Sequence, residues 1–442
     1  MPFIPHSKDE TAVMLKEIGV KTLDDLFGYI PADMRPKSFN LPEGASEQEV
    51  CTWFENVAEK NHKTINFMGG GIYNHSIPKA VDALSGRAEF YTSYTPYQPE
   101  AAQGTLQTIF EYQTSISRLL DMEVANASIY DGGSAMFEAA LMAVRHTKRD
   151  HIIVDEGVSP VYRTMLETLT ANLDVTIETV PLNGACACQQ ALADKLNDKV
   201  AAVIVQNPSF LGGIKDYSGL ADKIHAVKAL LIMVVNPVMC SVMKTPGAMG
   251  VDIAVAEGQN VGLPMAFGGP YLGILTCKKS LIRQLAGRIA GQTKDIDGKV
   301  GYVLTLQARE QHIRRQKATS NICSNQALCA LRTLIHLSLL GPEGIERVAL
   351  LSMQRAREAA AALAKIPGVS LACDQPYGYE FAVTLPKPAG EVVAALAKKG
   401  IMAGIPLGKM YKGMDNVLLV ACTETTTPEQ IETLATSLAA VL

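Results

Sequence analysis

The middle of the chain alternates short apolar runs with amphipathic stretches. Between about residues 134 and 276 the runs predict strands, and the stretches between them follow a helical period. Because the runs are continuously apolar, we expect strands buried on both faces of a mostly parallel sheet. The predicted strands are His151–Asp155, Asp174–Val180, Val200–Gln206, Ala229–Val235, Val251–Ala256 and Tyr271–Cys277, and the predicted helices are Ser134–Arg145, Val161–Ala171, Cys188–Leu196 and Leu220–Ala226.

The pattern changes after about residue 345. An Ala-rich stretch predicts a helix over Glu346–Ile366, and the last helix is expected to begin at Thr427-Pro428, since proline is favoured in the first helical turn. The segments between them predict strands near Val369–Cys373, Tyr379–Thr384, Met402–Pro406 and Asn416–Cys422 and a helix at Gly390–Lys399. We therefore expect a large α/β domain over residues 61–340 and a small C-terminal α/β domain over 341–442.

Residues 1–60 predict a helical N-terminal segment. Ser7 and Glu10 fit a capping box, and Gly19 can end the helix that follows. A second short helix can begin near Thr22 and must end by Pro31. We expect the apolar face of these helices to pack on the rest of the molecule.

Composition narrows the class of protein. The chain has 442 residues, of which 48% are apolar and 19% charged, so it is globular rather than disordered or fibrous. Its net charge of −4 argues against a nucleic-acid binder. No run approaches the ~20 apolar residues of a membrane helix, and we see no signal peptide, so we expect a cytoplasmic protein.

The nine cysteines are scattered along the chain, and Cys186 and Cys188 form the only close pair. No second pair or histidine stands at zinc spacing, so we expect no metal site. In a cytosolic protein such cysteines are expected to be free, buried thiols.

Two segments in the first third of the chain are rich in chemically useful groups. The loop Tyr91–Glu100 contains three tyrosines, among them Tyr94 and Tyr97, and two prolines that stiffen it. A helix with Glu111 and Gln113 follows. The segment Tyr130–Glu138 leads small residues into a helix with Ser134 near its N-terminus, which is a potential anion site. Tyr130 itself is expected to serve packing.

Two further segments lie later in the chain. Glu257–Pro270 follows a predicted strand, so it lies at the edge of the sheet where ligands bind in such folds. Leu306–Cys323 is strongly basic and ends in a turn made by Thr319, Ser320 and Asn321, whose donors could contact a phosphate. Taken alone, each segment also fits an ordinary loop, a capped helix or a solvated basic face.

Together, these segments resemble one family, the P-protein of the glycine cleavage system, and within it subunit 1 of the two-subunit form. The resemblance covers almost the whole chain and rests on the segments TSYTPYQPE, QGTLQ, NASIYDGGSAMFEA, EGQNVGLP, GGPYLG, REQHIRRQKATSNICSNQAL, GIMAGIPL and LLVACTET. It implies fold type I of the pyridoxal-phosphate (PLP) enzymes. It also implies a reaction in which glycine loses CO2 on PLP and its aminomethyl group passes to the lipoyl arm of the H-protein.

The resemblance also implies where the PLP groups should lie. The related catalytic subunit has its PLP lysine ahead of a Gly-rich turn, and that position falls on Gln259 in this chain. The carboxylate that faces the pyridine nitrogen falls on Asn236. Lys244 lies only eight residues after Asn236, too close to return on the next strand. We therefore expect that this chain does not bind PLP through a lysine.

The resemblance then suggests a subunit that completes the active site of its partner, subunit 2, which holds PLP. Tyr94 and Tyr97 would line the entrance for substrate and lipoyl arm, and the turn Thr319–Asn321 would reach the PLP phosphate. Arg309, Arg314 and Arg315 are weaker candidates for pairing with the partner or for docking an acidic H-protein. We expect a heterotetramer of two chains of each kind, and a homodimer when this chain is alone.

Two other classes of function stay open at this point. One is a self-sufficient PLP-dependent amino-acid decarboxylase or aminotransferase relative that acts through another lysine. The other is a catalytically empty scaffold that only stabilises its partner.

Overall fold

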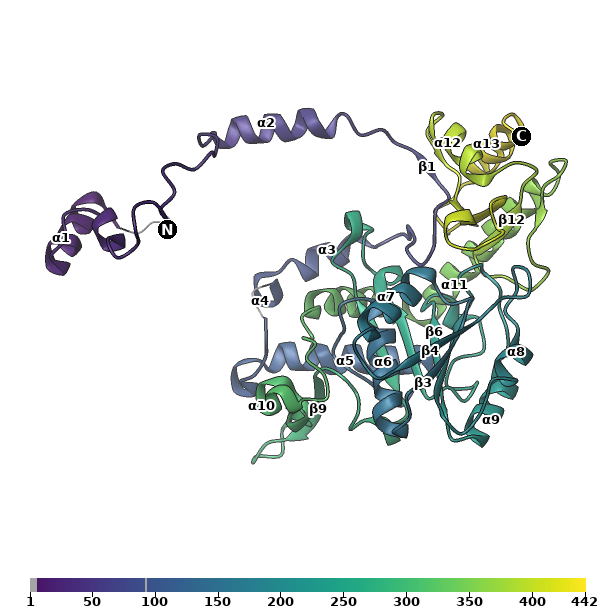
Figure 1. Ribbon diagram of the computed structural model, residues 1–442, viewed down its shortest axis with the longest axis horizontal. Helices are drawn as coiled ribbons and strands as arrows, with labels where there is room; N and C mark the ends of the chain where they lie inside the picture. Colours follow the sequence, from purple (N-terminus) through teal and green to yellow (C-terminus); the bar gives the residue numbers. More distant parts are fainter. Residues whose placement is uncertain (1–5, 92–93) are drawn as a thin grey trace. The chain divides into compact units, whose positions relative to one another are not determined.

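The computed structural model describes residues 6–91 and 94–442 (Figure 1). The described chain divides into two compact units, one that ends at His62 and one from Lys63 to Leu442. The four sheets of the described chain and the two pockets discussed below belong to the second unit.

The N-terminal unit contains the helices α1 (Lys8–Ile18) and α2 (Glu47–Ala58). As predicted, α1 begins at a capping box, in which the Ser7 amide donates to Glu10 Oε2 at 2.7 Å, and ends at Gly19 in a left-handed conformation. The second predicted helix is only a 3₁₀ turn, η1 (Asp24–Phe27), and α2 was not predicted. No residue of α1 or α2 is buried, so the burial expected for the apolar face of α1 is not found within this unit. Two short helices offer too little apolar surface to form a core of their own.

A seven-stranded sheet forms the centre of the second unit, in the order β2-β8-β7-β6-β5-β3-β4. The strands from β3 to β7 pair in parallel, whereas β8 is antiparallel to β7 and to β2. The mostly parallel sheet is thus confirmed. The strands are β2 (Val124–Ala125), β3 (His151–Asp155), β4 (Thr176–Val180), β5 (Val200–Asn207), β6 (Leu230–Val235), β7 (Ile253–Glu257) and β8 (Gly273–Cys277).

Helices cover both faces of this sheet, which explains its continuous apolar runs. Side chains of α6 (Gly132–Thr147) and α7 (Pro160–Thr170) pack on one face, together with Ile152 and Val154 of β3. On the other face, α5 (Gln103–Leu120), α9 (Ser218–Ala226) and α11 (Ala327–Leu363) pack against residues such as Ile153.

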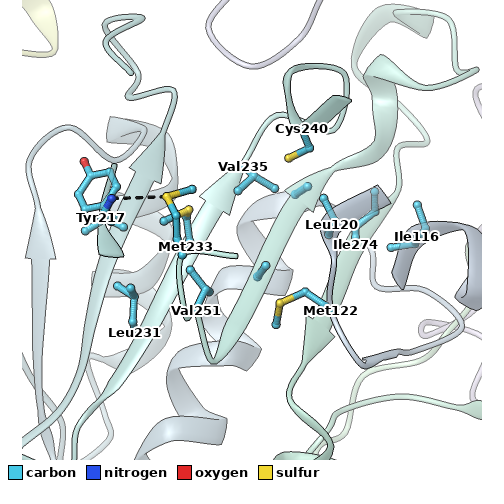
Figure 2. Packing of buried hydrophobic residues seen from close by; sticks show 14 of the residues in the cluster. Ile116, Leu120, Met122, Tyr217, Leu231, Met233, Val235, Cys240, Val251 and Ile274 are labelled. Atoms are coloured by element: carbon cyan, nitrogen blue, oxygen red, sulfur yellow. Dashed lines mark hydrogen bonds between the residues drawn. The ribbon is translucent and has the colours of Figure 1, made fainter. Parts of the chain in front are cut away.

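Figure 2 shows part of this second layer, with Ile116 and Leu120 of α5 and Met233 and Val235 of β6 in one buried cluster. Each large apolar side chain that becomes fully buried stabilises the fold by about 1.5–3 kcal/mol. The packed layers hold the ends of β5, β6 and β7 side by side, and those ends position the site described below.

The C-terminal part forms a smaller antiparallel sheet in the order β11-β12-β15-β14, packed against α12 and α13. The long helix α11 connects the two sheets. Its first half packs on the large sheet, and its second half packs on this smaller one. The helix begins well before the predicted start at Glu346, and it breaks at Gly341, whose φ of 62° favours glycine, just before Pro342. The elements are β11 (Ser370–Leu371), β12 (Glu380–Thr384), α12 (Ala389–Ala397), β14 (Ile405–Pro406), β15 (Val417–Ala421) and α13 (Pro428–Ala439).

An antiparallel hairpin of β9 (Ile289–Lys294) and β10 (Val300–Thr305) lies beside α5 and was not predicted. Gln113 of α5 fastens it, since the side-chain amide both accepts from the Ala290 amide and donates to the Ala290 carbonyl at 2.9 Å. The remaining elements are short: α3 (Lys79–Ser85), α4 (Ala88–Tyr91), α8 (Gln189–Ala193), α10 (Gln311–Arg314), and the parallel pair β1 (Ile65–Asn66) and β13 (Ile401–Met402). Within the described residues, no helix is both long and apolar enough to cross a membrane.

One pair of cysteines corrects the expectation of free thiols. Cys186 and Cys373 form a disulfide, although 187 positions separate them in the sequence. The bond joins the loop before α8 to the loop after β11. Asp374 lies next to this pair, but a disulfide offers no thiolate for a metal, so the group is not a candidate metal site. The other seven cysteines are free thiols.

Candidate functional site

The ends of the parallel strands surround a small cavity of about 50 Å³, here called the strand-edge pocket. Six polar residues that line or adjoin it determine its chemistry: Tyr73, Asn236, Glu257, Gln259, Tyr379 and Glu380. Of the described residues, no lysine lines this cavity. The volume is enough for a few water molecules only.

Gln259, the residue at the position implied for the PLP lysine, is almost fully buried and bonded at both ends of its amide. Its Oε1 accepts from the Tyr73 amide at 2.9 Å, and its Nε2 donates to the Tyr73 and Leu263 carbonyls at 2.8 and 3.0 Å. This amide therefore fastens the segment around Tyr73 to the turn after β7.

Asn236, the residue at the position implied for the PLP carboxylate, is also held by internal bonds. Its Oδ1 accepts from the amides of Val238 and Met239, which caps the turn after β6. Its Nδ2 donates to the hydroxyl of Tyr379. A neutral amide at this position caps a turn and binds a tyrosine, but it cannot form an ion pair.

Two buried carboxyls complete the strand-edge pocket. Glu257 Oε1 accepts from the amides of Gln259 and Leu272, and Glu257 Oε2 accepts from the amide of Gly132 at 3.0 Å. Glu380 accepts from the Gly70 amide and from the Tyr73 hydroxyl, both at 2.6 Å. Burial raises the pKa of each carboxyl to about 7, because no basic side chain lies close enough to offset the loss of solvation.

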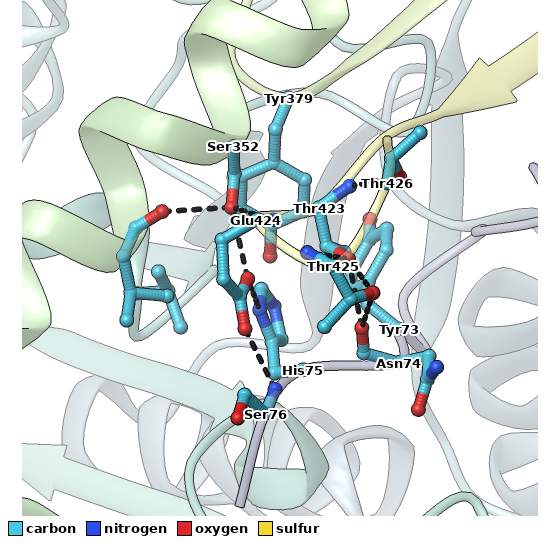
Figure 3. Close-up of polar contacts among 12 residues, drawn as sticks. Tyr73, Asn74, His75, Ser76, Ser352, Tyr379, Thr423, Glu424, Thr425 and Thr426 are labelled. Atoms are coloured by element: carbon cyan, nitrogen blue, oxygen red, sulfur yellow. Dashed lines mark hydrogen bonds and ion pairs between the residues drawn. The ribbon is translucent and has the colours of Figure 1, made fainter. Parts of the chain in front are cut away.

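A network around residues 73–76 places Tyr73 in this pocket (Figure 3). His75 Nδ1 lies 2.7 Å from Glu424 Oε2, and the Ser76 amide donates to Glu424 Oε1 at 2.6 Å. The hydroxyl of Thr423 donates to the Asn74 carbonyl at 2.8 Å. These bonds tie the chain before α3 to the turn after β15, so both parts of the unit contribute to the pocket.

A second cavity, of about 150 Å³, brings together candidate site residues that lie far apart in the sequence. We call it the loop pocket. It is lined by Tyr97, by the stretches 285–288 and 309–312, and by residues 319–324, which include Thr319, Ser320 and Asn321. Three basic side chains, Arg288, Arg309 and His312, line it as well, which makes it suited to an anionic group.

Tyr97 and Arg288 form the centre of the loop pocket. The Arg288 guanidinium lies 5.5 Å from the centre of the Tyr97 ring, and its Nη2 donates to the Tyr97 hydroxyl at 3.4 Å. The His312 ring is tilted against the same ring, with the two ring centres 5.1 Å apart. Tyr94 is more exposed and does not line the cavity, but its hydroxyl lies 3.9 Å from Cys323 Sγ, which does. The tyrosine loop and the Thr319–Cys323 stretch are therefore neighbours.

The three residues of the predicted phosphate turn differ in their freedom to bind a ligand. The Thr319 amide donates to the Arg309 carbonyl at 3.0 Å, and no bond to the Thr319 hydroxyl is found within the described chain. The Ser320 hydroxyl already donates to Glu138 Oε1 at 2.8 Å and so anchors the turn to α6. Asn321 is exposed, and its amide is free of partners among the residues described.

The loop pocket contains polar atoms without a partner. Arg288 is 7% exposed, and its buried Nε has no hydrogen-bond partner within the described residues; the nearest carboxylate oxygen, of Glu310, is 3.8 Å away. Glu310 Oε1 is also buried and unpartnered. Arg288 Nη1 donates to the Ser324 carbonyl at 3.2 Å, so the guanidinium is satisfied in part. A buried donor without a partner is costly, and the bare Nε leaves one donor that a ligand could use. Sequence reasoning missed Arg288, which is a single basic residue ahead of β9.

The weaker sequence candidates divide into two kinds. Arg309 donates to the carbonyls of Leu285, Gly287 and Leu306, so it holds the loop together and is not free for docking. Arg314 and Arg315 are exposed. Tyr130, for which we expected a packing role, also accepts a hydrogen bond at its hydroxyl from the Cys323 amide at 2.8 Å.

Comparison with known proteins gives a consistent picture. A family model described as "Glycine cleavage system P-protein" matches residues 1–438. The chain is 60% identical over 443 residues, the full length of both proteins, to a "Probable glycine dehydrogenase (decarboxylating) subunit 1" from Nitratidesulfovibrio vulgaris strain Hildenborough.

Solved structures agree with these relatives. The chain matches a crystal structure of glycine decarboxylase (P-protein) of the glycine cleavage system in inhibitor-bound form, with a TM-score of 0.93, 42% identity and full coverage of both chains. It also matches the glutamate decarboxylase of Lactobacillus brevis with a TM-score of 0.69 at 13% identity, over 92% of this chain and 95% of the other, a likeness that concerns the fold alone. The fold is that of the PLP-dependent fold type I enzymes.

Proposed function

Because the chain belongs to the glycine cleavage system P-protein family, in its subunit 1 branch, we propose that it completes a glycine-decarboxylating site on a partner chain, subunit 2. In this proposal the partner holds PLP, which supplies the electron sink for the loss of CO2. The lipoyl arm of an H-protein accepts the aminomethyl group. The assembly is a cytoplasmic heterotetramer with two copies of each subunit.

The residues of the strand-edge pocket do not fit PLP, which supports placing the cofactor on the partner. An amide at position 259 cannot form an imine, and an amide at position 236 cannot pair with a protonated pyridine nitrogen. Lys244, the nearest alternative, pairs with Asp216 at 2.9 Å and bonds to Ser218, away from the pocket lining. A cavity of about 50 Å³ also leaves no room for a ring and a phosphate.

The loop pocket is the part of the site that we assign to this chain. The observation that carries this assignment is the buried Arg288, whose Nε has no hydrogen-bond partner among the described residues. Arg288 provides the positive charge, Tyr97 and Tyr94 provide hydroxyls at the entrance, and Thr319 and Asn321 provide donors at the base. Such a set binds an anionic group, either the substrate carboxylate or the partner's cofactor phosphate. Ser320 keeps the turn in place through Glu138.

The test is activity in the reconstituted complex. We expect glycine–CO2 exchange to need both chains, and borohydride reduction to label a lysine on subunit 2 alone. A borohydride-fixed label on this chain would instead favour a self-sufficient PLP enzyme. Full exchange by complexes with altered loop-pocket residues, intact in size and PLP content, would favour a scaffold role.

A further inference from the structure

The N-terminus of α6 has the features of an anion site, yet two carboxyl groups of the chain itself already bind it. Asp131 Oδ1 accepts from the Ser134 amide at 2.8 Å, as an ordinary cap does. Glu257 Oε2 accepts from the Gly132 amide at 3.0 Å, although Glu257 lies 125 residues further along the chain. A long-range carboxylate on the first amide of a helix is not part of normal capping.

The surroundings of Glu257 show why an acidic side chain is retained there. It is 5% exposed, and among the described residues it takes part in no ion pair. An isolated buried carboxylate is costly unless donors replace its water. Here the donors are three amides, those of Gly132, Gln259 and Leu272, together with the positive end of the α6 dipole. One of these donors, the Gly132 amide, belongs to the first turn of α6, and a helix N-terminus is where such amides also bind phosphate.

The two glycines that open α6 are closely packed. A Cβ at Gly132 would lie 2.4 Å from the Tyr162 hydroxyl and 3.0 Å from the Glu257 amide, and a Cβ at Gly133 would lie 2.7 Å from Met165 Sδ. The start of α6 is thus pressed between the end of β7 and α7. Among the described residues, the acceptor of the Gly132 amide is the Glu257 carboxylate.

We infer that Glu257 is the resident anion of the α6 N-terminus: its carboxylate takes the place of an external phosphate and keeps anionic ligands out of the strand-edge pocket. This inference concerns the chain alone and does not depend on the proposed contribution to a partner's site.

The test measures inorganic phosphate binding to the purified full-length chain. Glu257→Ala removes the carboxylate and frees the amides, so we expect one phosphate site per chain beyond those of the wild type, at least about tenfold tighter than any wild-type binding there. Glu380→Ala is the matched control, because Glu380 is an equally buried carboxyl of the same pocket that accepts from no amide of α6. It should gain no site.

Glu257→Gln removes the negative charge of the side chain but keeps its volume, so it distinguishes the effect of the charge from that of filling the space. Its side chain still fills the space, so this variant should be less stable than the wild type and should gain no phosphate site. If Glu257→Ala folds only in the presence of phosphate, the refolding yield is measured at increasing phosphate concentrations. A yield that rises with phosphate then shows that phosphate binds the variant. The inference is overturned if folded Glu257→Ala gains no site, if Glu380→Ala gains one equally, or if phosphate changes hydrogen exchange at the Gly132 amide of the wild type.

Discussion

The strand-edge pocket and the loop pocket are both lined by polar side chains, but they differ in how those side chains are partnered. In the first, Gln259, Asn236, Glu257 and Glu380 all bind other parts of the chain. Asn260 Oδ1 is the one buried side-chain atom of its lining that has no partner among the described residues. In the second, the buried cation Arg288 has an Nε without a hydrogen-bond partner, and within the described residues the hydroxyl of Thr319 and the side-chain amide of Asn321, which line the cavity, make no hydrogen bond.

The difference separates two ways in which a fold can carry a site. The strand-edge pocket, where ligands bind in open α/β sheets, has become part of the core: its polar residues serve as internal fasteners. The loop pocket is built by segments outside the sheet and is incomplete by itself. A chain that closes its own pocket and leaves polar groups unpartnered elsewhere is suited to serve a site on another chain.

Substitution of Arg288 gives the strongest test of the difference between the two pockets. Arg288→Ala removes the buried charge, so we expect glycine–CO2 exchange in the reconstituted complex to fall at least about thirtyfold, since losing a buried charged contact costs about 2–5 kcal/mol. Arg288→Lys keeps the positive charge but loses the planar guanidinium, so its exchange rate should lie between those of the wild type and Arg288→Ala. Exposed Arg283 provides the control, as Arg283→Ala should leave exchange unchanged. Full activity of Arg288→Ala in an intact complex would contradict the assignment.

Tyr97 gives a smaller effect in the same pocket. Tyr97→Phe removes the hydroxyl that accepts from Arg288, and Tyr94→Phe removes the one beside Cys323. Each should lower exchange by about ten- to a hundredfold, as expected for a lost hydrogen bond to a charged group, without changing assembly or PLP content. Tyr302→Phe is a suitable control, because the Tyr302 ring packs on Phe110 away from the pocket. Equal losses in all three variants would point to general destabilisation.

Much of the fold could be predicted from the sequence, whereas the site could be predicted only in part. Continuous apolar runs such as Val200–Gln206 follow from burial on both faces, and that signal is local. The bond between Cys186 and Cys373, and the hydrogen bond between Glu257 and Gly132, depend on chain topology, which no local pattern reveals.

The loop pocket shows the same limit. Tyr97 and the turn at 319–321 stood out because several polar groups lie together in the sequence. Arg288 stands alone between apolar residues, and only the fold shows that it lies under Tyr97. The hairpin after it was missed because its β9 strand ends in polar, exposed residues, which resemble a loop.

In the strand-edge pocket, Glu380 should make stability depend on pH. Its folded pKa of about 7 lies above the usual value near 4.5, so its contribution is complete below about pH 4.5 and is lost as the pH rises to about 7. Glu380→Gln keeps an acceptor for the Gly70 amide and removes this titration. The fall in unfolding free energy between about pH 5 and pH 7.5 should therefore shrink by about 2 kcal/mol, as measured by urea unfolding of the full chain. Exposed Glu391 is the control, since Glu391→Gln should leave the slope unchanged.

The smallest expected effect is the most discriminating one. If the strand-edge pocket lacked only its lysine, Gln259→Lys would restore an imine with added PLP. We expect no borohydride-fixable absorption from this variant, because Asn236 still provides no carboxylate, Glu257 still occupies the α6 amides, and the cavity is still about 50 Å³. The new lysine should instead lower stability, since it breaks three hydrogen bonds with Tyr73 and Leu263. Gln206→Lys, which puts a lysine elsewhere in the same pocket, controls for nonspecific imine formation. An imine that forms with Gln259→Lys and not with Gln206→Lys would mean that the pocket is open and that the contrast between the two pockets is overstated.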